Sequence, residues 1–148
     1  MSISTLRKLY KRDLNRLKSE VGAYTDEKNL WITSDGISNC GGNLCLHLIG
    51  NLNAFIGAEL GNSGYVRQRE LEFSKKNVPK AALISEIEST ILVVDSTLEK
   101  LSEEDLSNEY PIVVFKESMS IGYFLMHLAT HLTYHLGQVN YHRRLLDR

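Results

Sequence analysis

The sequence contains very little proline and very little cysteine. Pro79 and Pro111 are the only prolines among its 148 residues, so almost nothing in the chain interrupts a helix. The two cysteines, Cys40 and Cys45, lie five positions apart. Without a secretory signal, so few cysteines are typical of reduced thiols in a cytosolic protein and argue against a disulfide scaffold. Both scarcities favour long helices that fold without cross-links.

The sequence also lacks a surplus of charge of one sign and a long hydrophobic run. It has 17 Lys and Arg against 18 Asp and Glu, a formal net charge of −1. Proteins that bind nucleic acid or anionic membranes through bulk charge need a basic surplus, so we expect neither partner. No apolar run reaches the roughly 18 residues of a membrane span, and residues 1–19 are too charged for a signal peptide. We therefore expect a cytoplasmic protein.

What the sequence does have is helical periodicity. Its content of 43% hydrophobic and 24% charged residues is that of a globular protein, and its length favours a single domain over residues 1–148. Apolar residues at alternating spacings of three and four predict four helices. These run from Ile3 to Tyr24, from Ser38 or Asn39 to Gly61, from Asn77 to Leu101 and from Ser118 or Ser120 to about Leu146. The predicted fold class is all-α, a four-helix bundle with long connections.

Smaller features complete this prediction. We expect Asp13 on the solvent-facing side of the first helix and Gly61 as the residue that ends the second. Residues 61–78 are predicted to form a loop. Two short apolar stretches, 30–33 and 112–115, are candidates for small extended segments, the second as part of a short two-stranded element.

Histidine is concentrated in the last predicted helix. His131 and His135 are spaced i and i+4, so both rings leave the same face of the helix and can hold one metal ion. His47, in the middle of the apolar second helix, is the candidate third ligand. The alternative is that these histidines are hydrogen-bonded core residues or face solvent.

The other polar candidates are less directly placed. His127 lies one turn before His131 and could replace either neighbour, but two spacings of four residues rotate the stripe by about 80° in total. His142 lies in a basic segment and is expected at the surface. Gln138 could hydrogen-bond a ligand ring or pack between helices. Cys45 is about 200° from His47 around the helix, too far to share its metal.

Two segments resemble signatures of the DinB/YfiT-like superfamily of four-helix bundles. The segment from His131 to Gln138 is similar to its closing pattern His-x-x-x-His-x-Gly-Gln, and the segment from His47 to Asn51 resembles its earlier His-Leu-x-Gly-Asn. The resemblance covers nearly the whole chain. It implies a divalent metal, zinc or nickel, held by His47, His131 and His135, with His127 in a supporting role. Where the family often has Asn before the paired histidines and Arg after them, this chain has Thr130 and Leu136.

Three neutral imidazoles leave coordination positions open, as catalytic metal sites do. The resemblance implies a metal-dependent transfer of a low-molecular-weight thiol to an electrophile, so a thiol S-transferase-like enzyme is the leading hypothesis. Arg67 and Arg69 could bind the carboxylates of such a thiol, or simply pair with Glu70 and Glu72 in solvent. The alternatives are a metal- or ligand-binding stress-response protein without turnover, a metal-dependent hydrolase, and a structural dimer. The apolar stripes also favour a homodimer.

Overall fold

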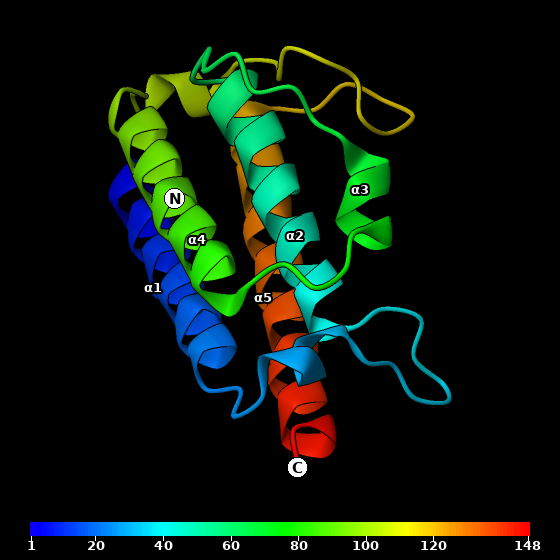
Figure 1. The fold of residues 1–148 in the computed structure, drawn as a ribbon. Coiled ribbons are helices and arrows are strands. Elements are labelled where there is room, and N and C mark those ends of the chain that lie inside the picture. The colour runs from blue at the N-terminus through cyan, green and yellow to red at the C-terminus, as the bar shows by residue number, and fades with distance from the viewer.

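Four long helices run side by side in the computed structural model, which describes residues 1–148 (Figure 1). They are α1 (Ile3–Gly22), α2 (Gly41–Leu52), α4 (Lys80–Glu99) and α5 (Ile121–Leu146). A π-helical segment, η2 (Asn53–Ala58), extends α2. The short elements are η1 (Glu27–Trp31), α3 (Arg69–Ser74) and η3 (Glu104–Ser107). The predicted all-α bundle is confirmed. None of the helices combines the length and apolarity needed to cross a membrane.

The order of the helices in space requires two long connections. Helices α1 and α4 form one side of the bundle, and α2 and α5 the other (Figure 1). Because α2 and α4 both run upward in this view, the chain must return the length of the bundle between them. The returning segment, residues 59–79, carries α3, which packs against the outside of α2.

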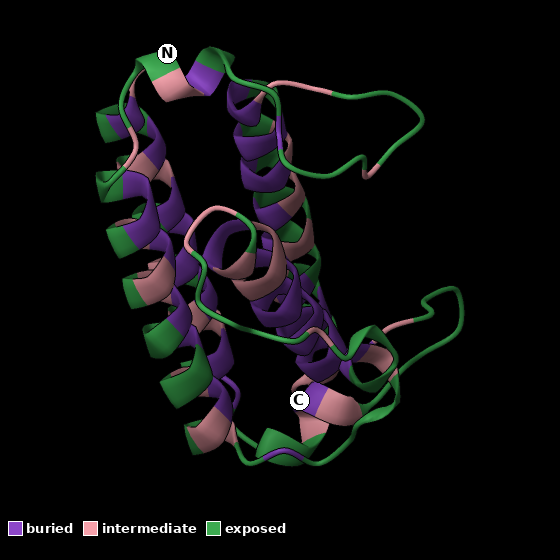
Figure 2. Ribbon diagram, turned by 90° about the horizontal axis from the view of Figure 1, so that it is seen from above, coloured by how far each residue is buried: buried purple, intermediate pink, exposed green.

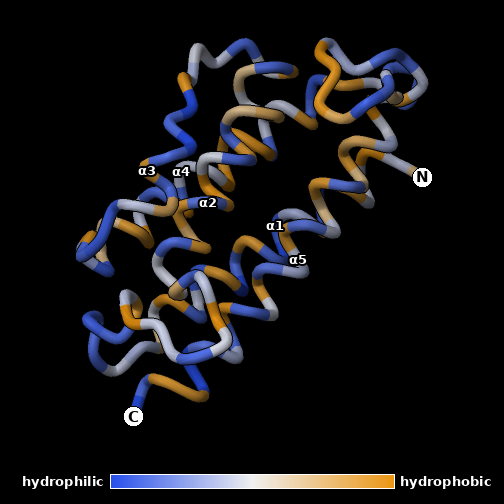
Figure 3. Tube along the Cα trace, turned by 90° about the vertical axis from the view of Figure 1, so that its right-hand side faces the viewer, coloured by the Kyte–Doolittle hydropathy of each residue, from blue (hydrophilic) through white to orange (hydrophobic).

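The apolar stripes meet between these two sides. In Figure 2 the buried parts of the long helices face inward, and in Figure 3 hydrophobic and hydrophilic residues alternate along the helices as the sequence periodicity predicts. Two of the long helices begin at side-chain caps. The hydroxyl of Ser2 accepts from Thr5 N, and that of Ser120 from Tyr123 N, both at 3.1 Å.

Several local predictions were wrong. The N-cap of α2 is Cys40 rather than Ser38 or Asn39, and α4 begins after Pro79. The left-handed residue after the second helix is Asn62, at φ 49°, not Gly61. Residues 30 and 31 belong to the 3-10 helix η1, and residues 112–115 form no strand, since an isolated bridge between Glu109 and Ser120 is the only pairing. The predicted loop 61–78 contains α3.

Asp13 is also misplaced by the sequence, because it is buried rather than solvent-facing. Thr133 Oγ1 on α5 donates to its carboxylate at 2.6 Å, and Arg12 Nε donates at 2.7 Å. Burial by itself raises the pKa of this carboxyl, but the hydrogen bonds from Arg12 and Thr133 outweigh it and lower the pKa below its ordinary value. The carboxylate thereby links α1 to α5.

Candidate metal centre

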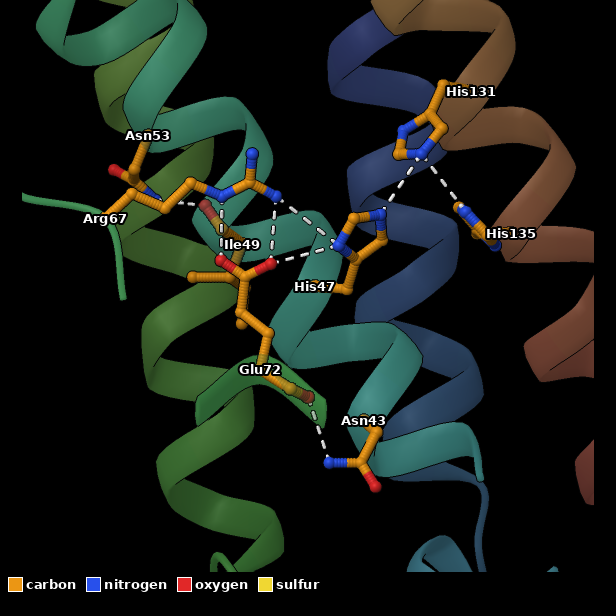
Figure 4. A network of polar contacts seen from close by, with 8 residues as sticks. All are labelled: Asn43, His47, Ile49, Asn53, Arg67, Glu72, His131 and His135. Carbon is orange, nitrogen blue, oxygen red and sulfur yellow. Dashed lines mark hydrogen bonds and ion pairs between the residues drawn. The ribbon is translucent and has the colours of Figure 1, made fainter. Parts of the chain in front are cut away.

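Three histidine rings converge between α2 and α5 (Figure 4). His131 Nε2 lies 3.2 Å from His47 Nε2 and 3.1 Å from His135 Nε2. Four donors placed tetrahedrally around zinc at ~2.0–2.1 Å lie about 3.3 Å apart. The structure therefore brings together the three residues that the sequence predicted, at separations close to those of a metal-ligand set.

Hydrogen bonds on the far sides of two rings fix which nitrogen faces the centre. His47 Nδ1 donates to Glu72 Oε1 at 3.0 Å, and His135 Nδ1 donates to Gln138 Oε1 at 2.6 Å. With the proton on Nδ1, each ring presents an Nε2 lone pair to the centre. Metal-binding histidines commonly have such a partner on their other nitrogen.

These lone pairs cannot be satisfied by the three rings alone. The third ring, that of His131, has a buried Nδ1 with no hydrogen-bond partner. With the His131 proton on Nε2, that proton can bond only one of the two lone pairs, on His47 or on His135. With the proton on Nδ1, three Nε2 lone pairs face one another. A cation at the centre satisfies all three at once, so the donor set fits a divalent metal such as zinc or nickel.

Burial keeps two of the imidazoles neutral. The pKa of His131 is lowered to about 4 by burial and by the neighbouring histidines. Burial also lowers the pKa of His135, although its hydrogen bond to Gln138 works in the opposite direction. At neutral pH both rings are therefore unprotonated and able to bind a metal.

Glu72 was predicted only as a solvent-exposed partner of the arginines, and its place in the site was missed. It does pair with Arg67, but it is buried. Its buried carboxylate accepts the hydrogen bond from His47 Nδ1 and a two-point contact from Arg67, whose Nε and Nη2 each lie 2.9 Å from an oxygen. Burial alone raises the pKa of Glu72, but the bonds from His47 and Arg67 outweigh it and lower the pKa. Glu72 thus stays a carboxylate that can orient His47.

Two residues of α2 hold α3 in place around this carboxylate. Asn43 Nδ2 donates to the backbone oxygens of Glu72 and Lys75, at 2.9 and 2.8 Å. Gly50 leaves the space that the Glu72 side chain fills, since a Cβ there would overlap the carboxylate. The only sequence signal for Glu72 was its position three and five residues after Arg69 and Arg67, since its contact with His47 joins residues 25 apart.

Arg67 and Arg69 differ in the structure. The guanidinium of Arg67 is occupied by Glu72 and also lies 5.4 Å from the ring centre of Phe55. Arg69 forms no ion pair and lies over the ring of Phe73, at 5.2 Å. Because Phe73 in turn contacts the ring of His47, with ring centres 5.0 Å apart, a free guanidinium lies one ring away from the centre.

The remaining candidates lie outside the donor set. The ring of His127 stacks between Phe124 and His131, with ring centres 5.8 and 6.3 Å away. Cys45 is buried elsewhere in the core. His142 is buried, which contradicts the prediction of a surface residue. Its ring is held by Tyr24 Oη at 2.6 Å and by the backbone oxygen of Ile32 at 2.9 Å.

Comparison with known protein families shows to which family the chain belongs. A family described as a protein of unknown function, DUF1572, matches residues 3–148. The chain belongs to the DUF1572 family. No curated protein matches it.

In this DUF1572 chain, the number of protein donors at the centre decides what a bound metal could do. Three protein donors are fewer than the four of a closed structural zinc site, so the set leaves coordination positions for water or a substrate. The side chains of His131 and His135 are partly exposed, and Tyr134 borders His135, with ring centres 5.3 Å apart. The two histidines of α5 are therefore only partly shielded from solvent.

Proposed function

We propose that the protein is a metal-dependent enzyme of the DinB/YfiT type that transfers a low-molecular-weight thiol to an electrophile. The observation that carries the proposal is the convergence of three Nε2 lone pairs, two of them fixed by Nδ1 hydrogen bonds to Glu72 and Gln138. A divalent metal bound there stabilises a thiolate, or a hydroxide, at neutral pH.

The residues of the chain supply orientation and charge. Glu72 and Gln138 hold His47 and His135 with their lone pairs inward. Arg69, which has no carboxylate partner, is placed to bind a carboxylate of the thiol, whereas Arg67 already uses Nε and Nη2 in a two-point contact with Glu72. The anion-binding role predicted for two arginines thus becomes a proposal for Arg69 alone.

Metal content tests the first half of the proposal. Elemental analysis of untagged protein should find about one zinc or nickel ion per chain, and little in His135→Ala. The matched control is His127→Ala, which removes a histidine from the same helix outside the donor set and should leave the metal content unchanged. Wild-type protein that remains metal-free after incubation with either ion would contradict the proposal.

A screen of thiols against electrophiles tests the second half. Metal-loaded protein should consume thiol with at least one electrophile, and Arg69→Gln should raise KM for a carboxylate-bearing thiol more than it lowers kcat. Ester hydrolysis without thiol consumption would instead favour the hydrolase hypothesis. Metal binding without either activity would favour a binding protein.

A further inference from the structure

A cavity of about 600 Å³ lies between the 34–39 loop and the last turns of α5, and none of the three histidines of the candidate metal centre lines it. This loop projects at the lower right of Figure 1, next to the C-terminal end of α5. Pockets for small organic ligands typically measure ~300–1,000 Å³, so the space has the size of a binding site.

Apolar side chains line much of the cavity. Leu44 forms part of its floor, and Ile37, Tyr141 and Leu145 border it while remaining 44%, 62% and 56% exposed. Large apolar side chains that are exposed around a cavity are unfavourably hydrated. An apolar ligand that covers them gains about 25 cal/mol of binding free energy per Å² of apolar surface buried. The lining therefore favours a ligand with an apolar body.

The polar part of the lining is neutral overall. Ser38, Asn39 and Gln138 offer hydroxyl and amide groups, and the charged residues are one aspartate and one arginine, Asp35 and Arg148. The lining ring of His142 already has a partner on each nitrogen. No surplus of either charge is available to repay the desolvation of an ionic ligand, so an uncharged hydrogen-bonding end fits best.

One lining residue is shared with the metal centre. Gln138 borders the cavity, and its Oε1 accepts the 2.6 Å hydrogen bond from His135 Nδ1. Leu44 precedes His47 by one turn on α2. A ligand that moves the Gln138 amide changes the hydrogen bond that orients a metal-binding ring.

We propose that this cavity binds an uncharged, largely apolar organic molecule with a hydrogen-bonding end, and that Gln138 couples its binding to the metal centre. The binding part rests on the cavity alone. The coupling part rests on the proposed function, and by linkage the ligand and the metal change each other's affinity by the same factor.

Calorimetry with 1-octanol, octanoate and octylamine tests the binding part, on protein as purified and after treatment with a chelator. Octanol should bind saturably with a Kd below about 1 mM, and more tightly than either ion. Leu145→Asp should weaken binding at least about tenfold. Leu92→Asp, at an exposed position (72%) on α4 outside the cavity, is the matched control and should change nothing. No saturable binding, equal binding by Leu145→Asp, or tighter binding of an ion would each overturn the proposal.

Zinc affinity with and without saturating octanol tests the coupling part. A competing chelator should report a change of about threefold or more in wild-type protein, and none in Gln138→Leu. Unchanged zinc affinity in wild-type protein overturns the coupling, while the calorimetry on chelator-treated protein still decides the binding part. A result that contradicts the proposed binding in the cavity is thus distinguishable from one that contradicts the proposed metal centre.

Discussion

At His47, two different kinds of neighbour meet one imidazole ring. Its Nε2 faces His131, and its Nδ1 faces a carboxylate that is itself held by an arginine. Helical spacing and a family resemblance were enough to predict the three histidines. They could not predict Glu72, because nothing periodic relates it to His47 and the contact exists only once the 59–79 connection folds back on α2.

The role of Glu72 can be tested with a nearly isosteric substitution. Glu72→Gln keeps the shape of the side chain but removes the charge that favours the proton on His47 Nδ1, so metal affinity should fall ~10–100-fold. Glu70→Gln, two residues earlier on the exposed side of α3, is the matched control. Affinity is measured by chelator competition, with circular dichroism as the check on folding. Equal affinities in the two variants would mean that Glu72 only holds α3 in place.

At the scale of the elements, the long helices were predictable and the short ones were not. Alternating apolar spacing placed all four long helices, since their stability comes from burying one face. The six-residue α3 has no such stripe, and it depends on contacts from Asn43 and on the space at Gly50. Buried Asp13 and His142 were missed for a related reason, because Thr133 and Tyr24, the partners that bury them, lie more than 100 residues away in sequence.

Two glycine substitutions separate packing from helix propensity. Gly50→Ala places a Cβ into the Glu72 carboxylate and should reduce the free energy of unfolding by about 1–3 kcal/mol. At Gly137, in the middle of α5, a Cβ meets nothing within 4 Å. Gly137→Ala should therefore raise the free energy of unfolding by up to about 1 kcal/mol. Urea unfolding followed by circular dichroism measures both. Similar effects of the two substitutions would contradict the packing of α3 described above.

The C-cap of α5 should make stability depend on acidic pH. Asp147 accepts from Thr25 N at 2.7 Å and from Asn29 Nδ2 at 2.9 Å. Burial opposes the effect, but these bonds lower its pKa from 3.8 to about 2. Because the folded pKa is the lower one, the stabilisation is complete above pH ~5 and is lost as pH falls from about 4 towards 2.

Denaturant unfolding of an Asp147→Asn variant measures this contribution. The variant should lose about 1 kcal/mol at pH 7, a modest value because the carboxylate is accessible to solvent. The difference from wild type should shrink at pH 3. Asp35→Asn, in the 34–39 loop, is the control at both pH values. A difference that stayed constant or grew on acidification would show that the Asp147 charge is not the source.

On the scale of the whole molecule, the proposed metal ligands join helices that are distant in sequence. His47 comes from α2 and the paired histidines from α5, so one ion would link two of the four long helices. The apolar stripes of α1 and α4 that favoured a homodimer are largely buried within the chain, against each other and the core. The homodimer stays a prediction.

Metal binding should therefore stabilise the entire fold. A ligand that binds only the folded state at 100 times its Kd adds about 2.7 kcal/mol, which raises Tm by several degrees for a protein of this size. Thermal unfolding with and without added zinc should show this rise in wild type and in His127→Ala, and its absence in His131→Ala. Equal shifts in all three proteins would place the bound zinc elsewhere.

The parallel run of α2 and α4 has a consequence for engineering. The three donor histidines belong to the bundle, whereas the carboxylate and guanidinium behind His47 belong to the connection that this topology requires. Donors and the groups that adjust them are thus encoded in separable stretches of sequence. A library varied only at residues 67 to 72 would retune the basicity of one proposed ligand while leaving the long helices and their donor atoms unchanged.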